Sequence, residues 1–264
     1  MPFIRSGSPD THLFYEDFGA GPPIVLLHGW PLSGRFWEGQ VRALVEAGHR
    51  VVCPDRRGFG RSAQPWEGYD YDTFAADLTA ILLALDLEDA VLVGHSTGCG
   101  DVVRCAASGS VRPRAVVLAD PVLRLDPDTD PTVADDLTDA GLGYRIAMLD
   151  DVLRRLFSVD GRPALDQATH RYLLGLAAAA SPKGGIDAIT AWAHTRFTHD
   201  LTHLKVPTLI VHGASDAFAP FESGPVQIAA LISHVVRVEI PHAPHAAPFT
   251  HAEQWTRILL DFLA

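Results

Sequence analysis

The sequence predicts an α/β protein built on one mostly parallel, eight-stranded sheet with helices on both faces. Two observations support this class. Short runs rich in β-branched residues alternate with longer amphipathic stretches, which is the pattern of a parallel sheet with helical crossovers. The 264 residues are 47% hydrophobic and only 20% charged, so the chain carries enough apolar surface for the large core that such a sheet needs.

Eight strands are expected, of which the first two form an antiparallel hairpin at one edge of the sheet. Their expected ranges are Phe3–Arg5, His12–Tyr15, Ile24–His28, Arg50–Pro54, Ala90–Gly94, Ala115–Ala119, Thr208–His212 and Val235–Ile240. A helix is expected where Phe74, Leu78 and Leu85 fall on a single apolar stripe. The closing helix is expected to begin at a capping box formed by Thr250 and Glu253.

The alternation of strands and helices stops between Pro121 and about Leu204. That segment is helical in pattern, rather apolar, and carries no strand signal. It is much longer than the dozen or so residues that an ordinary crossover needs. We therefore expect residues 121–204 to form a helical cap inserted into a core made of residues 1–120 and 205–264. The alternative is that these helices simply continue the layers that cover the sheet.

The charge, the lengths of the apolar runs and the cysteine content limit the partners and the compartment expected for this chain. A formal net charge of −11 argues against binding to nucleic acid or to an anionic membrane. No apolar run approaches the roughly 20 residues that cross a bilayer. The start of the chain, residues 1–5, has no long apolar segment of the kind found in signal peptides. Three cysteines, an odd number, predict reduced thiols in a cytoplasmic protein.

The most informative motif is a Gly-x-Ser-x-Gly sequence at Gly94–Gly98, between the apolar run Ala90–Val93 and the helix-compatible run Asp101–Ala107. A serine at such a strand-to-helix turn sits on a nucleophile elbow. The turn is so tight that its flanking positions must be small, and it leaves the hydroxyl exposed at the end of the sheet. Ser96 is therefore the candidate nucleophile.

A serine hydroxyl needs a positioned base, and that base needs an acid. In a sheet of this kind the acid and the histidine follow the serine in that order along the chain. Asp216 comes just after a late strand and His245 lies between the last strand and the last helix, so these two are the candidates. Asp120 also follows a strand, and His242 lies in the same loop as His245. From position alone both alternatives stay open, although Asp216 is favoured over Asp120.

Two backbone amides are expected to face the negative charge that develops on a reacting carbonyl. One is the N–H of Thr97, which directly follows the nucleophile, and the other is the N–H of Trp30 in the loop after the third strand. Gly29 allows that loop to turn back over the serine. His28 is interpreted as orienting the loop by a hydrogen bond, and His95 fills the variable position of the elbow without a chemical role.

No motif calls for a metal or a cofactor. Neither a His-Glu-x-x-His nor a Cys-x-x-Cys sequence is present. The glycines of Gly58–Ser62 lack the lysine of a phosphate-binding loop, and they are interpreted as a turn. We expect the chain to work without a cofactor.

From about Pro22 to its C-terminus the chain resembles α/β-hydrolases of the cofactor-free haloperoxidase, perhydrolase and aryl-esterase group. The resemblance is densest at Leu27–Ser33, Asp55–Ser62, Tyr69–Leu78 and Gly94–Gly98 and in the tail motif Ala243-Pro244-His245. It implies the α/β-hydrolase fold. It also favours His245 over His242 and, through His212-Gly213 followed by Asp216, Asp216 over Asp120.

The resemblance implies an activity as well. Members of this group hydrolyse carboxylic esters, and they also convert a carboxylic acid and hydrogen peroxide into a peracid that oxidises halide without a metal. Pro31 matches the proline that follows the oxyanion-loop aromatic residue in members with perhydrolase activity. Cys99 stands where the group usually has glycine, and residues 126–162, in the expected cap, resemble the group least. The acyl pocket is therefore expected to be particular to this chain.

The expected partner is a small-molecule ester or lactone, with small to medium apolar or aromatic groups on an ester. Two other interpretations remain open on the same scaffold. One is a hydrolase of carbon–carbon bonds, which needs further polar groups from the cap. The other is a non-catalytic ligand receptor, against which the intact set of Ser96, Asp216 and His245 argues. Association into a homo-oligomer is also left open.

Overall fold

A computed structural model of the chain describes residues 2–7, 11–125, 132–219 and 224–264, and the side chains of helix α4 (Thr132–Leu156) only from residue 143 onward. One sheet of eight strands organises the molecule. Its spatial order is β1 (Phe3–Arg5), β2 (His12–Phe18), β4 (Arg50–Pro54), β3 (Pro23–Leu27), β5 (Val91–His95), β6 (Ala115–Ala119), β9 (Thr208–Gly213) and β10 (Val235–Ile240). The eight predicted strands are all present, with ends that differ by three residues at most.

The sheet is antiparallel only at one edge. Strands β1 and β2 form the predicted hairpin, β2 pairs antiparallel with β4, and every pairing from β4 to β10 is parallel. The central strands β5 and β6 are buried along their whole length. Such continuous apolar runs are typical of parallel strands covered on both faces, so the predicted fold class is confirmed.

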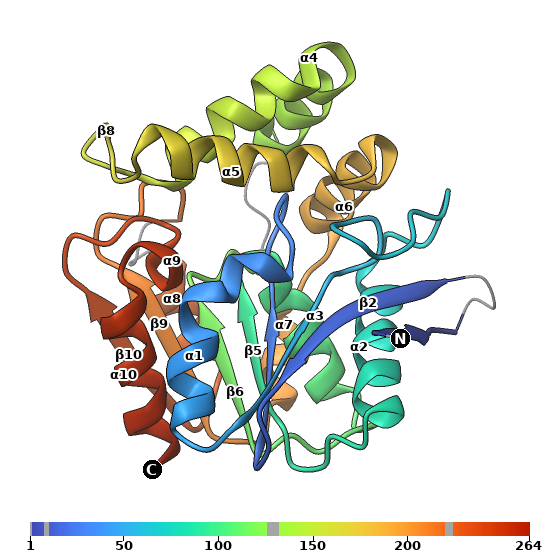
Figure 1. Ribbon diagram of the computed structural model, residues 1–264, viewed down its shortest axis with the longest axis vertical. Helices are drawn as coiled ribbons and strands as arrows, with labels where there is room; N and C mark the ends of the chain where they lie inside the picture. The colour runs from blue at the N-terminus through green and yellow to red at the C-terminus, as the bar shows by residue number, and fades with distance from the viewer. Residues whose placement is uncertain (1, 8–10, 126–131, 220–223) are drawn as a thin grey trace.

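Helices cover both faces of the sheet (Figure 1). Helices α1 (Glu38–Glu46) and α10 (Ala252–Leu263) pack against each other on one face, after the short turn η1 (Gly34–Trp37). Helices α2 (Tyr71–Ala84), α3 (Gly98–Ala107) and α7 (Thr198–His203) pack together on the other face. The short helix α8 (Pro225–Ala230) contacts β9, and α9 (Ala247–Thr250) directly precedes α10.

Three helices lie beyond the carboxyl ends of the strands, at the top of Figure 1. They are α4, α5 (Gln167–Ala178) and α6 (Pro182–His194), and α4 packs against both of the others. Helix α4 is bent at Tyr144, whose backbone is not helical. The sequence carries no strand signal here, yet Ser158–Val159 (β7) and Arg162–Pro163 (β8) form a short antiparallel pair. Two-residue strands are too short to leave a periodic pattern in a sequence.

The predicted start of the last helix is wrong. Helix α10 begins after His251, and no side-chain cap is formed there. Thr250 instead ends the preceding helix α9, where its hydroxyl donates to the carbonyl oxygen of Ala246. Glu253 pairs with Arg257 one turn further along. The break between α9 and α10 therefore removes both members of the expected capping box.

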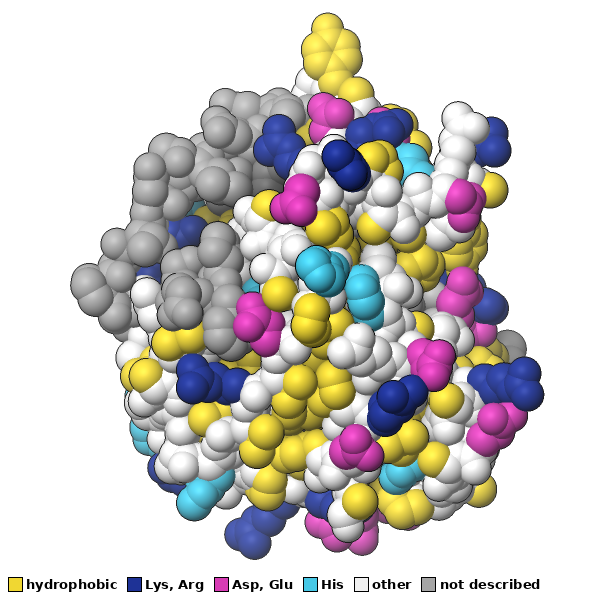
Figure 2. Space-filling view, turned by 90° about the vertical axis from the view of Figure 1, so that its left-hand side faces the viewer, with side chains coloured by type: hydrophobic (Ala, Val, Ile, Leu, Met, Phe, Trp, Pro, Cys, Tyr) yellow, Lys and Arg dark blue, Asp and Glu magenta, His cyan; other side chains and the backbone are white. Residues whose placement is uncertain are grey.

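The surface mixes charge with apolar side chains. On the face shown in Figure 2, acidic and basic side chains are interspersed among hydrophobic ones, and neither sign forms a continuous patch among the coloured residues. Within the described residues, no helix combines the length and the apolar character that crossing a bilayer requires.

Two buried ion pairs fix the loop after β4 to the helices beneath it. Arg57 donates to both carboxylate oxygens of Asp77 on α2, at 2.5 and 2.6 Å, and Ser6 donates to the same carboxylate. Arg56 donates to both oxygens of Asp101 on α3, at 2.7 and 2.9 Å. These four charged side chains are at most 7% exposed, so each charge depends on its partner for compensation.

Removing one member of a buried pair leaves an uncompensated charge in the core. We expect Asp77→Ala to lower the free energy of unfolding by about 3–5 kcal/mol. On the same helix Asp72 is 84% exposed and pairs with Arg104, so Asp72→Ala is the matched control and should cost at most about 1 kcal/mol. Denaturant titration of both variants measures the two values, and equal losses would contradict a structural role for the buried pair.

Candidate active site

Ser96 occupies a tight turn between β5 and α3. Its backbone has φ +53°, in the left-handed region that non-glycine residues rarely adopt. A Cβ atom at Gly94 would lie 2.7 Å from the carbonyl oxygen of Gly98, and one at Gly98 would lie 2.5 Å from that of His28. The two glycines are therefore required by close backbone approach. The turn places Ser96 at the carboxyl end of the sheet.

The structure brings Ser96, His245 and Asp216 into one hydrogen-bonded line. The Ser96 hydroxyl lies 2.9 Å from Nε2 of His245. Nδ1 of His245 lies 2.7 Å from Oδ2 of Asp216. Since Nδ1 donates to the carboxylate, Nε2 is left to accept the serine proton. All three residues are at most 5% exposed.

The two alternative residues lie elsewhere. His242 is exposed, two residues beyond the end of β10. The carboxylate of Asp120 accepts hydrogen bonds from the backbone amides of Gly213, at 2.9 Å, and Ala247, at 3.1 Å. Gly213 ends β9, just before the loop of Asp216, and Ala247 follows His245. Asp120 therefore ties together the two loops that carry the acid and the histidine.

The two aspartates differ in electrostatic environment. Burial raises the pKa of Asp216, but the rings of His245 and His212 and its hydrogen bonds outweigh burial and hold that pKa below its ordinary value. Oδ1 of Asp216 also accepts the backbone amides of Phe218 and Ala219, at 2.8 and 2.9 Å. Burial and the neighbouring charge of Asp216 raise the pKa of Asp120 well above its ordinary value. The negative charge of the site is thus concentrated on Asp216.

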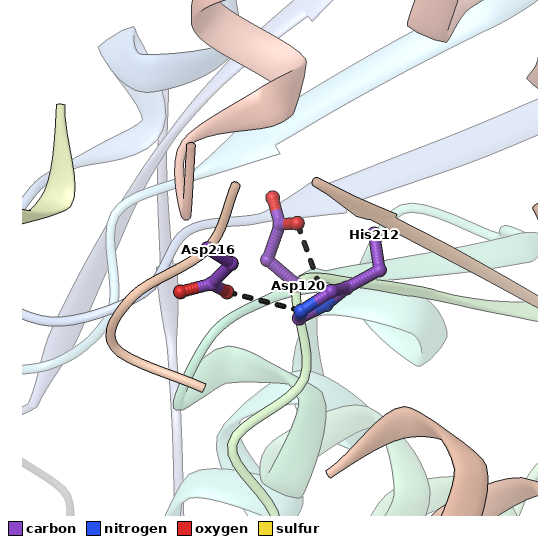
Figure 3. Close-up of side chains that lie close together, drawn as sticks. All are labelled: Asp120, His212 and Asp216. Carbon is purple, nitrogen blue, oxygen red and sulfur yellow. Dashed lines mark ion pairs between the residues drawn. The ribbon is translucent and has the colours of Figure 1, made fainter. Parts of the chain in front are cut away.

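The ring of His212 lies between these two carboxylates (Figure 3). Its Nε2 is 3.2 Å from Oδ2 of Asp216, and its Nδ1 is 3.6 Å from Oδ1 of Asp120. Nε2 also lies 2.7 Å from the carbonyl oxygen of Ala219. Ligand atoms of these three side chains lie within 4.8 Å of one another, close enough to share a cation. Because every carboxylate oxygen here already has a partner inside the protein, we interpret the cluster as a hydrogen-bonded frame for Asp216.

The loop after β3 reaches the site as expected, and His28 orients it. Nε2 of His28 accepts the backbone amide of Arg56 at 3.0 Å, and Nδ1 donates to the carbonyl oxygen of Gly29 at 2.9 Å. Burial and the nearby Arg56 cation lower the pKa of His28 to about 3, so the ring is neutral. Both ring nitrogens are engaged in holding the backbone, which confirms the loop-orienting interpretation.

The amide of Trp30 is not free in this structure. It donates to the side-chain hydroxyl of Thr97 at 2.9 Å, whereas the sequence predicts that it points at the reacting carbonyl. The Trp30–Pro31 peptide bond is cis. The indole Nε1 of Trp30 donates to the carbonyl oxygen of Gly185 on α6, at 3.0 Å. Trp30 therefore links the elbow at Ser96 and the loop after β3 (residues 28–31, the oxyanion loop) to helix α6 above the sheet.

Three comparisons with known proteins place the chain in a family. The family model described as alpha/beta hydrolase fold matches residues 22–252. The non-heme chloroperoxidase CPO-A1 of Kitasatospora aureofaciens is 35% identical, with 96% of each chain covered. The bifunctional esterase/perhydrolase DCH of Acinetobacter calcoaceticus is also 35% identical, with 95% of each chain covered. The crystal structure of bromoperoxidase from Bacillus anthracis matches with a TM-score of 0.93 and 40% identity over 99% of each chain.

The chain belongs to the alpha/beta hydrolase family. Both the predicted fold class and the resemblance to the cofactor-free haloperoxidase and esterase group are confirmed.

A narrow pocket adjoins the oxyanion loop of this hydrolase. Its walls are mostly apolar and come from that loop, from α4 and from α6. They include Trp30, Pro31, Met148, Leu149, Ile186 and Ile189. Ser96 is not among the lining residues of this pocket.

His95 is a positioning residue that the sequence analysis missed. Its Nε2 donates to the backbone carbonyl oxygen of His245 at 3.1 Å, and its ring stacks on Phe36 with centroids 4.3 Å apart. Burial and the neighbouring His245 lower its pKa to about 3. The contact joins residues 150 positions apart. A residue at the variable position of a motif gives no sequence signal for such a contact.

The neutral ring of His95 makes stability depend on pH. Its pKa in the folded protein lies below the unfolded value of 6.5, so below pH 6.5 the unfolded chain takes up a proton that the folded one does not. Stability is lost as the pH falls through that window. Between pH 7 and pH 5 we expect wild type to lose about 2 kcal/mol more than His95→Gln, which keeps a donor for the carbonyl.

Urea titrations of both proteins at pH 7 and pH 5 measure this difference. Contributions of His28 and of the carboxylates are common to the two proteins and cancel. Equal losses in wild type and variant would show that His95 is not held neutral by the fold.

Proposed function

We propose that this protein is a serine hydrolase of carboxylic esters with small to medium apolar or aromatic groups. The observation that carries the proposal is the hydrogen-bonded line from the Ser96 hydroxyl through His245 to Asp216. The Ser96 oxygen attacks the ester carbonyl while Nε2 of His245 takes the hydroxyl proton. Collapse of the tetrahedral intermediate breaks the bond to the alcohol, which receives that proton from His245. The acyl group remains on Ser96.

The second half of the reaction returns the enzyme to its starting state. A water molecule gives a proton to His245, and its oxygen attacks the acyl carbon. The bond to Ser96 breaks, the serine oxygen regains the proton, and the carboxylic acid leaves. Asp216 holds Nδ1 of His245 in the donating tautomer and stabilises the imidazolium, for which its lowered pKa suits it. A lactone would be opened by the same groups.

Hydrogen peroxide can replace water as the acceptor at the same acyl-enzyme. Its oxygen then takes the acyl group, the product is a peracid, and the peracid oxidises halide in solution. The names of the haloperoxidase and esterase/perhydrolase relatives support this second activity. Pro31 in the oxyanion loop supports it as well. Neither reaction takes an electron from the protein, and both use Ser96, His245 and Asp216.

We further propose that the helices above the sheet form a cap that selects the acyl group. The support is their place beyond the strand ends and the hydrogen bond from Trp30 to Gly185. The cap as proposed comprises α4, α5 and α6. Helix α7 packs on α3 and so belongs with the sheet layers. The buried free thiols of Cys53, Cys99 and Cys105 support a cytoplasmic enzyme.

Replacing the nucleophile tests the mechanism. We expect Ser96→Ala to lower hydrolysis of p-nitrophenyl esters, from acetate to decanoate, by at least about 1,000-fold while the protein stays folded. Peracid formation from acetate and hydrogen peroxide, followed by bromination of a dye, should fall in parallel because both reactions share the acyl-enzyme. A fluorophosphonate probe should label wild type at Ser96. Undiminished hydrolysis in the variant would exclude Ser96 as the nucleophile.

His245 and His242 lie in the same loop, so substitutions of the two make a matched test of the catalytic base. We expect His245→Gln to lower kcat by about 1,000-fold or more, since the serine loses its base. His242→Gln changes an exposed side chain of the same loop and should leave kcat unchanged. Steady-state kinetics on p-nitrophenyl acetate measures both. A comparable loss in the two variants would point to disturbance of the loop instead of loss of the base.

A further inference from the structure

The side chain of Thr97 occupies a position that the mechanism above leaves unexplained. Its hydroxyl oxygen accepts the backbone amide of Trp30 at 2.9 Å and lies 3.4 Å from Nη1 of Arg56. The residue is only 6% exposed. The Trp30 amide is the group that the fold was expected to aim at the developing oxyanion, and here that amide is already bonded to Thr97.

The donor and acceptor capacity of a hydroxyl limits what Thr97 can do. A threonine oxygen has two acceptor positions and one proton. The contacts from Trp30 and Arg56 fill both acceptor positions. Within the described residues, no acceptor for the hydroxyl proton is found. The proton is therefore available to a ligand, and the two donors on its oxygen restrict where it can point.

We propose that the Thr97 hydroxyl donates a hydrogen bond to the oxyanion, alongside the backbone amide of the same residue. In this structure the Trp30 amide fixes that hydroxyl. This inference rests on the proposed ester hydrolysis at Ser96. No proton leaves Thr97: the hydrogen bond shortens as charge builds on the carbonyl oxygen and lengthens when the intermediate collapses.

The surroundings of Thr97 suit a fixed donor. Arg56 is held by Asp101 in a buried bidentate pair, and its guanidinium lies 4.1 Å from the ring centre of Phe74. The Tyr71 hydroxyl donates to the backbone carbonyl oxygen of Thr97 at 3.1 Å. The side chain and the backbone of Thr97 are thus each held by buried groups. Donors on a hydroxyl oxygen also strengthen the hydrogen bond that its proton makes.

The test compares Thr97→Val, which replaces the hydroxyl by a methyl group of similar size, with Thr97→Ser, which keeps it. Each is assayed on p-nitrophenyl acetate and on the matching thionoester, whose developing charge lies on sulfur, a weak hydrogen-bond acceptor. We expect Thr97→Val to lower kcat on the oxygen ester by about 100-fold, the cost of one oxyanion donor. KM should change little, and kcat on the thionoester should fall far less than kcat on the oxygen ester. Thr97→Ser should recover most of the loss on the oxygen ester.

Three outcomes would overturn the donor role. If Thr97→Val is as fast as wild type or faster, the hydroxyl merely blocks the Trp30 amide. If both esters slow equally, the substitution misaligns the site without removing a donor. If Thr97→Ser is as slow as Thr97→Val, the methyl group is what matters. Wild type without Ser96-dependent turnover would instead contradict the proposed function, and the donor role with it.

Discussion

The backbone must turn from β5 into α3 within one left-handed residue, and the rest of the site is arranged around that turn. Ser96 has a φ of +53°, and on either side of it the neighbouring backbones approach Gly94 and Gly98 to within 3 Å of where a Cβ would stand. Such strain persists only where the surroundings over-determine it. Here they do so by burial on both sides of the sheet and by the ion pair of Arg56 with Asp101 in the first turn of α3.

The site also requires that the loop of Asp216 and the loop of His245, which follow different strands, come together at the serine within hydrogen-bond distance. Asp120 holds the two loops together by accepting one backbone amide from each, and His95 holds the second loop by donating to the carbonyl of His245. Both side chains are buried at the ends of adjacent central strands. The ionisation states of His95 and Asp120 suit this structural role. His95 stays neutral and Asp120 has a raised pKa, so the negative charge lies on Asp216, where it serves His245.

Much of this arrangement is readable from the sequence, because it depends on local pattern. The strands are apolar runs, and Ser96 stands in a motif that backbone crowding makes glycine-rich. What the sequence leaves open depends on contacts between distant residues. Asp120 and Asp216 both follow strands, and only the path of the loops decides which meets His245. The capping box at Thr250 fails for a similar reason: hydrogen bonds from the backbone amide of Ala247 to the Asp120 carboxylate and from Gln40 to the carbonyl of Pro248 hold α9 as a separate turn.

The buried ion pairs show why a costly feature is kept in a core that apolar residues could fill. Desolvation offsets most of what a buried pair gains, so such a pair is weak evidence for stability and better evidence for positioning. Arg56 illustrates this, since its guanidinium binds Asp101 with two hydrogen bonds and still approaches the Thr97 hydroxyl with its remaining nitrogen. An apolar replacement could fill the same volume, but the Thr97 hydroxyl would then be held by the Trp30 amide alone. The geometry of a planar, permanently charged fork is what lets a single side chain brace α3 and orient a group at the nucleophile.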